Sequence, residues 1–186
     1  MTNISERLLG GMIKEGIISA EDREIYLFGI KELFSQIFTY SIMLGIGAAF
    51  GMLMETIVFL VVYMSLRVYA GGYHASTQLR CYILSFGMVI AALMLIRITN
   101  VSETIALIGI ILMGISIYFM APSEHKNKPL SENEKKVYKR KVGKRVIVFI
   151  MLSFVAAITS MGEILITIGI ALMFLIVMMI CNRQKV

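Results

Sequence analysis

The sequence is poor in several residue types: it has no tryptophan, two cysteines, two histidines and two prolines among 186 residues. Without tryptophan, the aromatic positions at a membrane surface must be filled by tyrosine and phenylalanine. The two cysteines, Cys81 and Cys181, are 100 positions apart, so nothing indicates a disulfide framework. Neither a metal site nor a cofactor is expected.

Charged residues are also scarce, at 16% of the chain, whereas hydrophobic residues make up 58%. Soluble domains are about half apolar and about a quarter charged. A soluble domain of this length could not bury so much apolar surface, so we predict one all-α, polytopic membrane domain over residues 1–186. The net charge of +6 lies beside apolar segments, which argues against nucleic-acid binding and indicates membrane orientation.

Charged residues divide most of the sequence into six apolar blocks. A helix needs about 20 residues to cross the hydrocarbon core of a bilayer. The second and third blocks reach this length only by including part of the segment between them. We therefore expect about six transmembrane helices, with four helices plus two re-entrant segments as the alternative. The blocks are residues 33–54, 56–66, 81–96, 104–123, 146–162 and 164–182.

The distribution of lysine and arginine predicts the orientation. Six spans place residues 1–32, 67–80, 122–145 and the tail after Cys181 on one side of the membrane. These regions contain 17 of the 18 basic residues. Because basic residues favour the cytoplasmic side, both termini are expected in the cytoplasm, and the alternative with four spans gives the same sides.

Residues 1–32 are expected to form a cytoplasmic or interfacial arm. Six acidic and four basic residues lie in it, so no cleavable signal peptide is expected. An apolar stripe predicts a short amphipathic helix at the membrane surface that ends near Gly16, followed by a helix capped by Ser19. A mobile terminus is the alternative. The stripe consists of Ile4, Leu8, Met12 and Ile13.

Residues 122–145 contain both prolines, and nine basic against three acidic residues. We expect a basic cytoplasmic loop that fixes the orientation and lies on anionic lipid. The same loop can serve as a docking surface for an acidic segment of a partner, and the two roles are compatible. The docking candidates are Lys128, Pro129, Lys135, Lys136, Lys139, Arg140 and Lys141.

Residues 67–81 combine a backbone break with two reactive side chains. Gly71 and Gly72 permit conformations that a helix does not use, and His74 and Cys81 follow them. A cysteine thiolate is a nucleophile, and a nearby imidazole is a common activator of it. On one straight helix, two side chains at this spacing would lie roughly 10 Å apart, whereas the pair needs about 3–3.5 Å.

We therefore expect the helix to break after the glycines and a new helix to be capped near Ser76 or Thr77. Cys81 would then lie just past the first turn, where the helix dipole favours a thiolate. Residue types alone leave another interpretation open: a cysteine in an apolar helix is more often a packing residue, and a histidine beside glycines is often a loop residue. Cys181 and His125 are expected to play these ordinary roles.

Two other protein classes are also open. A transporter would carry polar or charged residues inside several spans, and these blocks contain almost none. A membrane scaffold would use glycines as helix-packing surfaces, for which Gly45, Gly47 and Gly51 are candidates.

The string Arg67-x-x-x-Gly71-Gly72-x-His74-Ala75, followed by Cys81, resembles the AgrB family (accessory gene regulator protein B). A second stretch is similar too. It contains Tyr118, Ala121-Pro122, Asn127-Lys128-Pro129-Leu130 and a basic run through Arg145. With the loop lengths and the six blocks, the resemblance covers essentially the whole chain.

The resemblance implies a cysteine endopeptidase of the bacterial cytoplasmic membrane that acts in quorum sensing. Its catalytic residues would be His74 and Cys81, supported by Arg67 and by Gly72 with the adjacent Gly71. Its substrate would be an AgrD-type propeptide with an acidic C-terminal tail, and cyclising members close a thiolactone ring. The family resemblance also implies a homodimer.

Overall fold

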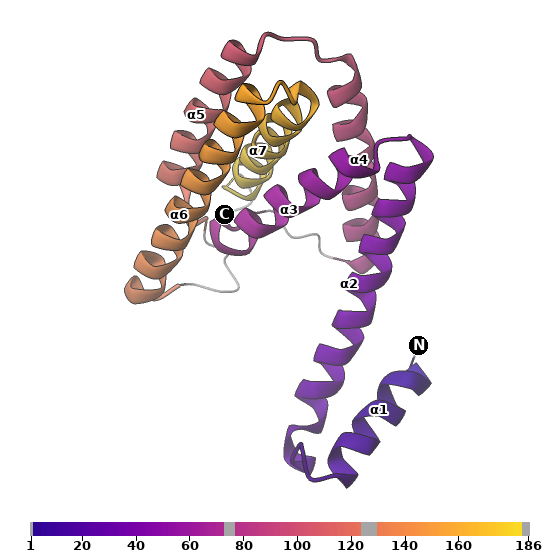
Figure 1. The fold of residues 1–186 in the computed structure, drawn as a ribbon. Coiled ribbons are helices and arrows are strands. Elements are labelled where there is room, and N and C mark those ends of the chain that lie inside the picture. The colour runs from indigo at the N-terminus through magenta and orange to yellow at the C-terminus, as the bar shows by residue number, and fades with distance from the viewer. Residues whose placement is uncertain (1, 73–76, 124–129, 184–186) are drawn as a thin grey trace. The chain divides into compact units, whose positions relative to one another are not determined.

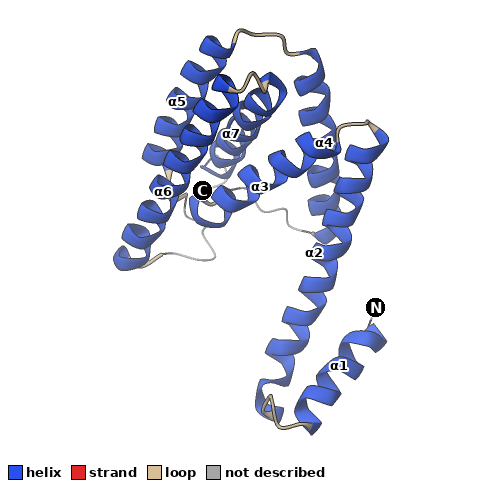
Figure 2. Ribbon diagram, viewed as in Figure 1, coloured by secondary structure: helices blue, strands red, loops and turns tan. Residues whose placement is uncertain are grey.

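The computed structural model describes residues 2–72, 77–123 and 130–183. These residues form seven α-helices and a short 3-10 helix, and they contain no strand (Figure 2). The predicted all-α class is therefore confirmed. The chain divides into two compact units, Met1–Met43 and Leu44–Val186.

The first unit begins with helix α1, Thr2–Lys14. The chain turns at Gly16, whose φ of 70° lies in the left-handed region that favours glycine. Ile4 and Leu8 are exposed, while Leu9 is buried. The expected amphipathic helix is therefore present, and part of its apolar stripe is exposed.

Ser19 starts the next helical segment, as predicted. Its Oγ accepts a hydrogen bond from the Glu21 N–H at 3.1 Å. A 3-10 helix, Ala20–Asp22, leads into the long helix α2, Arg23–Ala49.

Four helices of the second unit are long and apolar enough to cross a membrane: α3, Leu53–Ala70; α4, Gln78–Ile98; α5, Glu103–Met120; and α7, Gly162–Arg183. Large apolar side chains on these helices are exposed, among them Val61, Ile83, Leu112 and Val177. Apolar side chains are stable in this position against lipid. The chain is therefore a helical membrane protein.

Six spans were expected, and four of the described helices meet the criteria of length and composition. Residues 33–54 do not form one helix, because α2 ends at Ala49 and α3 begins at Leu53. Gly51, with a φ of 70°, occupies the turn between them, and the Met52 N–H donates to the Gly47 carbonyl at 2.8 Å. This hydrogen-bond pattern closes helix ends, and it needs no charged residue.

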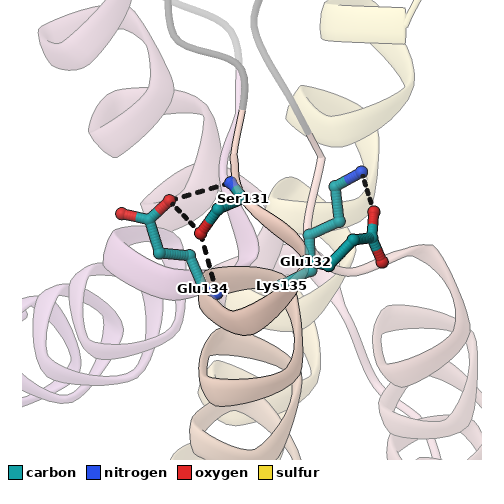
Figure 3. A network of polar contacts seen from close by, with 4 residues as sticks. All are labelled: Ser131, Glu132, Glu134 and Lys135. Carbon is teal, nitrogen blue, oxygen red and sulfur yellow. Dashed lines mark hydrogen bonds and ion pairs between the residues drawn. The ribbon is translucent and has the colours of Figure 1, made fainter.

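The other block, residues 146–162, lies mostly in the second half of helix α6, Glu132–Ile158. The first half of α6 covers residues 132–145, which were expected to be loop. Ser131 caps this helix: its Oγ accepts from the Glu134 N–H at 3.3 Å, and the Glu134 carboxylate accepts from the Ser131 N–H at 2.8 Å (Figure 3). This capping box begins the helix before the basic run. The expectation of a loop was therefore wrong for residues 132–145, which are helical.

Helix α7 lies at the centre of the second unit and packs against α3, α4, α5 and α6 (Figure 1). Small residues let α5 and α6 approach closely. A Cβ on Gly114 would lie 2.8 Å from Val146 Cγ1, and one on Gly143 would lie 3.1 Å from Tyr118 Cε2. Close packing at small residues is a main source of helix association in membranes.

Candidate functional site

The predicted break lies between α3 and α4. Helix α3 ends at Ala70, and Gly71 follows with a φ of 80°. The Gly71 N–H donates to the Arg67 carbonyl at 3.0 Å, which completes the last turn of the helix. A Cβ on Gly71 would overlap the backbone carbonyl oxygen of Ser123. Glycine is therefore required here both by the conformation and by the lack of space.

Thr77 caps the new helix, as predicted. Its hydroxyl accepts from the Arg80 N–H at 3.4 Å, and the Cys81 N–H donates to the Thr77 carbonyl at 3.1 Å. Cys81 thus closes the first turn of α4, where the helix dipole favours negative charge. Its side chain is a half-buried free thiol.

His74 and Ser76 lie outside the described residues, as do His125, Lys128 and Pro129. The pairing of His74 with Cys81 therefore stays a prediction. Across the ranges 2–72, 77–123 and 130–183, no group of three or more His, Cys, Asp or Glu side chains could hold a metal ion.

Arg67 lies one turn before the break, on the side of α3 that carries Tyr63. Its Nη1 donates to the Tyr63 hydroxyl at 2.9 Å, and its guanidinium carbon lies 5.5 Å from the centre of that ring. Tyr63 is fully buried and stacks on Phe59. Sequence reasoning missed Tyr63, although its spacing of four residues from Arg67 is a usable signal.

The basic residues of α6 fall into two groups, and those of the first group have an aromatic ring or a carboxylate nearby. Lys141 Nζ lies 4.7 Å, and the Arg145 guanidinium carbon 4.1 Å, from the centre of the Tyr69 ring on α3. Two other docking candidates also have nearby partners: Lys139 lies over the Tyr118 ring at 5.1 Å, and Lys135 pairs with Glu132 at 3.0 Å.

The second group is an exposed row along α6, which we call the basic row: Lys136, Arg140 and Lys144. Their spacing of four residues places them on one face of the helix. Two of the three were docking candidates from the sequence; Lys144 was not.

Two polar residues that the sequence did not identify lie beside the break. The Asn182 side-chain amide donates to Ser123 Oγ at 2.9 Å, and the Ser123 N–H donates to the Ala70 carbonyl at 2.8 Å. Asn182 is 2% exposed, at the end of α7. The ends of α3, α5 and α7 therefore meet at the glycine turn.

Comparison with known proteins gives a consistent result. The chain matches the protein family Accessory gene regulator B (AgrB) over residues 5–181. A protein of Listeria welshimeri described as AgrB-like is 28% identical over 142 residues, which cover 74% of this chain and 69% of that protein. AgrB-like protein 2 of Clostridium perfringens is 28% identical over 152 residues, covering 78% and 71%.

FsrB of Enterococcus faecalis is 30% identical over 122 residues, covering 64% of this chain and 50% of FsrB. No solved structure matches the chain. The family match runs from α1 to the end of α7 and includes Arg67, both glycines and Cys81. Because it extends over nearly the whole sequence, this membrane protein belongs to the AgrB family of quorum-sensing accessory gene regulators.

Proposed function

We propose that this protein is a membrane cysteine endopeptidase that removes the C-terminal tail of an AgrD-like propeptide. Cys81 is the nucleophile and His74 is its base. The observation that carries the proposal is the start of α4, where the Thr77 cap places Cys81 at the end of the first helical turn. The AgrB family, which is known for peptide processing, supports this reaction class.

The reaction proceeds in two steps. Cys81 Sγ, after giving its proton to His74, attacks the scissile carbonyl carbon, and a carbon–sulfur bond forms. The carbon–nitrogen bond then breaks, and His74 returns the proton to the amine of the departing tail. The product is an acyl-thioester on Cys81.

In the second step, a cysteine of the propeptide attacks this thioester and displaces Cys81, which closes a thiolactone ring. One thioester replaces another, so the bond types are balanced. Water would compete by hydrolysing the intermediate, so the site must exclude it. A position at the membrane interface suits this requirement.

The remaining features support substrate binding. The basic row attracts the acidic tail electrostatically, and dissolved salt weakens this attraction. Arg67, held against Tyr63, orders the last turn of α3 before the break. Both termini and the site face the bacterial cytoplasm, and the protein acts as a homodimer.

Co-expression with an AgrD-like propeptide, followed by intact-mass analysis, tests the proposal. Wild type is expected to remove the tail, whereas Cys81→Ala and His74→Ala remain in the membrane without cleaving. Cys181→Ala is the matched control, because Cys181 is exposed at the end of α7. A cyclised product would have the mass of the cleaved linear acid minus one water. Cleavage by Cys81→Ala would contradict the proposal and favour a transporter or scaffold role.

A further inference from the structure

Two hydrogen bonds connect helix α7 to the glycine turn. Asn182 donates to Ser123 Oγ at 2.9 Å, and the Ser123 backbone N–H donates to the Ala70 carbonyl at 2.8 Å. Asn182 and Ser123 are 59 positions apart in the sequence. The connection therefore depends on the tertiary fold and not on local structure.

The acceptor of the second bond has a particular position. Ala70 is the last residue of α3, and the final carbonyls of a helix have no partner within it. Ser123 supplies such a partner from the chain that follows α5. The Ser123 carbonyl oxygen also occupies the space that a Cβ on Gly71 would need. The backbone of Ser123 thus contacts the turn through both its N–H and its carbonyl.

The side chain of Ser123 is held in turn by Asn182. Burying an amide among apolar side chains is unfavourable unless it is hydrogen-bonded. Asn182 is buried near the end of a largely apolar helix, and its bond to Ser123 satisfies part of that requirement. A leucine at this position would extend the apolar helix without holding Ser123.

We propose that Asn182 and Ser123 are positioning residues that fix where the chain leaves α3, and thereby align the segment between Gly71 and Thr77 with Cys81. This inference rests on the proposed function, because that segment contains His74. The two residues hydrogen-bond to each other, and Ser123 also bonds to the end of α3. Their effect is on turnover, since a displacement of about 1 Å can lower a rate by about 100-fold.

The test uses purified protein in proteoliposomes, in a Cys181→Ser background that leaves Cys81 as the remaining thiol. Ser123→Ala and Asn182→Ala remove the side-chain bond, and Ser123→Thr keeps the hydroxyl. Ser116→Ala is the matched control, because the Ser116 hydroxyl bonds to the Leu112 carbonyl within its own helix. Two quantities are measured: kcat and KM for tail release from a synthetic AgrD-like propeptide, and the rate of Cys81 alkylation by N-ethylmaleimide.

Ser123→Ala and Asn182→Ala are expected to lower kcat by about 10- to 100-fold with little change in KM. They should also change the rate of Cys81 alkylation. Ser123→Thr and Ser116→Ala should match the parent protein in both measurements. Should Asn182→Ala fail to insert, the comparison of Ser123→Ala with Ser123→Thr decides the question, since both keep the backbone bond to Ala70.

Unchanged kcat in Ser123→Ala and Asn182→Ala would overturn the positioning role, as would a loss that Ser123→Thr shares. Failure of the proposed function looks different, because the parent protein itself would then release no tail. In that case the alkylation rates decide the positioning role, and equal rates in all variants overturn it.

Discussion

At the residue scale, two adjacent glycines have different physical requirements. Gly71 has a φ of 80°, and a Cβ there would overlap the Ser123 carbonyl oxygen. Gly72 has no such conformation, and the nearest atom to its Cβ would be Met178 Cβ at 3.8 Å, an ordinary contact. The family resemblance points to Gly72, whereas the geometry makes Gly71 the more demanding position.

Gly71→Ala is therefore expected to lower propeptide cleavage much more than Gly72→Ala. Gly71 combines a φ of 80° with a ψ of −176°, a backbone region that essentially only glycine adopts and that costs other residues about 1–3 kcal/mol. The overlap with Ser123 adds to this cost. Initial rates of tail release, normalised to the amount of protein in the membrane, make the comparison. Equal losses in the two variants would contradict it.

Some of these residue roles could be predicted from the sequence, and others could not. The break after the glycines and the cap at Thr77 were predictable, because both depend on residues that are close in sequence. The roles of Tyr63, Ser123 and Asn182 were not identified. Ser123 and Asn182 meet only after α5 and α7 have packed, and no local pattern specifies that contact.

At the element scale, α6 combines a basic half with an apolar half in one continuous helix. Sequence reasoning ended the apolar block at the first charged residue, so it treated residues 132–145 as loop. The Ser131 capping box instead starts the helix before the charges. The basic half then has one face against Tyr69 and another that carries the basic row.

The two faces are expected to respond differently to substitution. Replacing Lys136, Arg140 and Lys144 with glutamine should slow substrate capture, and more so at low salt, because screening is weaker there. Capture rates measured at two or more ionic strengths give the salt dependence.

Replacing Lys141 and Arg145 with glutamine serves as the comparison. These residues lie over the Tyr69 ring, and such contacts contribute about 0.5–2 kcal/mol. The double variant should therefore lower the melting temperature in detergent. If it alters the salt dependence as much as the basic-row variant does, the division into two faces is wrong.

The contact between α5 and α6 gives a second test at this scale. Gly114→Ala places a methyl group 2.8 Å from Val146 Cγ1, and the buried, branched Val146 has little freedom to move. Overpacking of this kind costs about 1–3 kcal/mol. Gly109→Ala on the same helix is the control, because its nearest neighbour is the flexible end of Met113 at 3.9 Å. Equal melting temperatures of the two variants would refute the expectation.

At the scale of the whole molecule, the helices differ in how much lipid they can contact. In α7, 44% of the span is buried inside the protein, against 17% in α5. α7 is thus more enclosed by the other helices of the second unit than α5 is. The composition predicted a membrane protein, but packing distinguishes a central helix from a peripheral one, since both helices are apolar enough to cross a membrane.

The two ends of α7 provide a test of orientation. Cys181 is exposed near its C-terminal end, and Met161 is exposed in the turn before it. In a Cys81→Ala background, a membrane-impermeant maleimide should label Cys181 in inside-out vesicles but not in right-side-out vesicles.

A Met161→Cys, Cys181→Ser variant in the same background should show the opposite pattern, because the two positions lie at opposite ends of one membrane-spanning helix. Labelling of both positions from the same side would contradict the predicted orientation.

The hydrogen bond between Asn182 and Ser123 has a practical consequence for anyone who purifies or images this protein. An affinity tag or fluorescent protein joined directly after α7 would place a bulky group beside Asn182 and could disturb its hydrogen bond to Ser123. A long flexible spacer would reduce this disturbance. Activity lost in such a fusion should therefore be checked against a tag placed before α1, before it is attributed to any substitution.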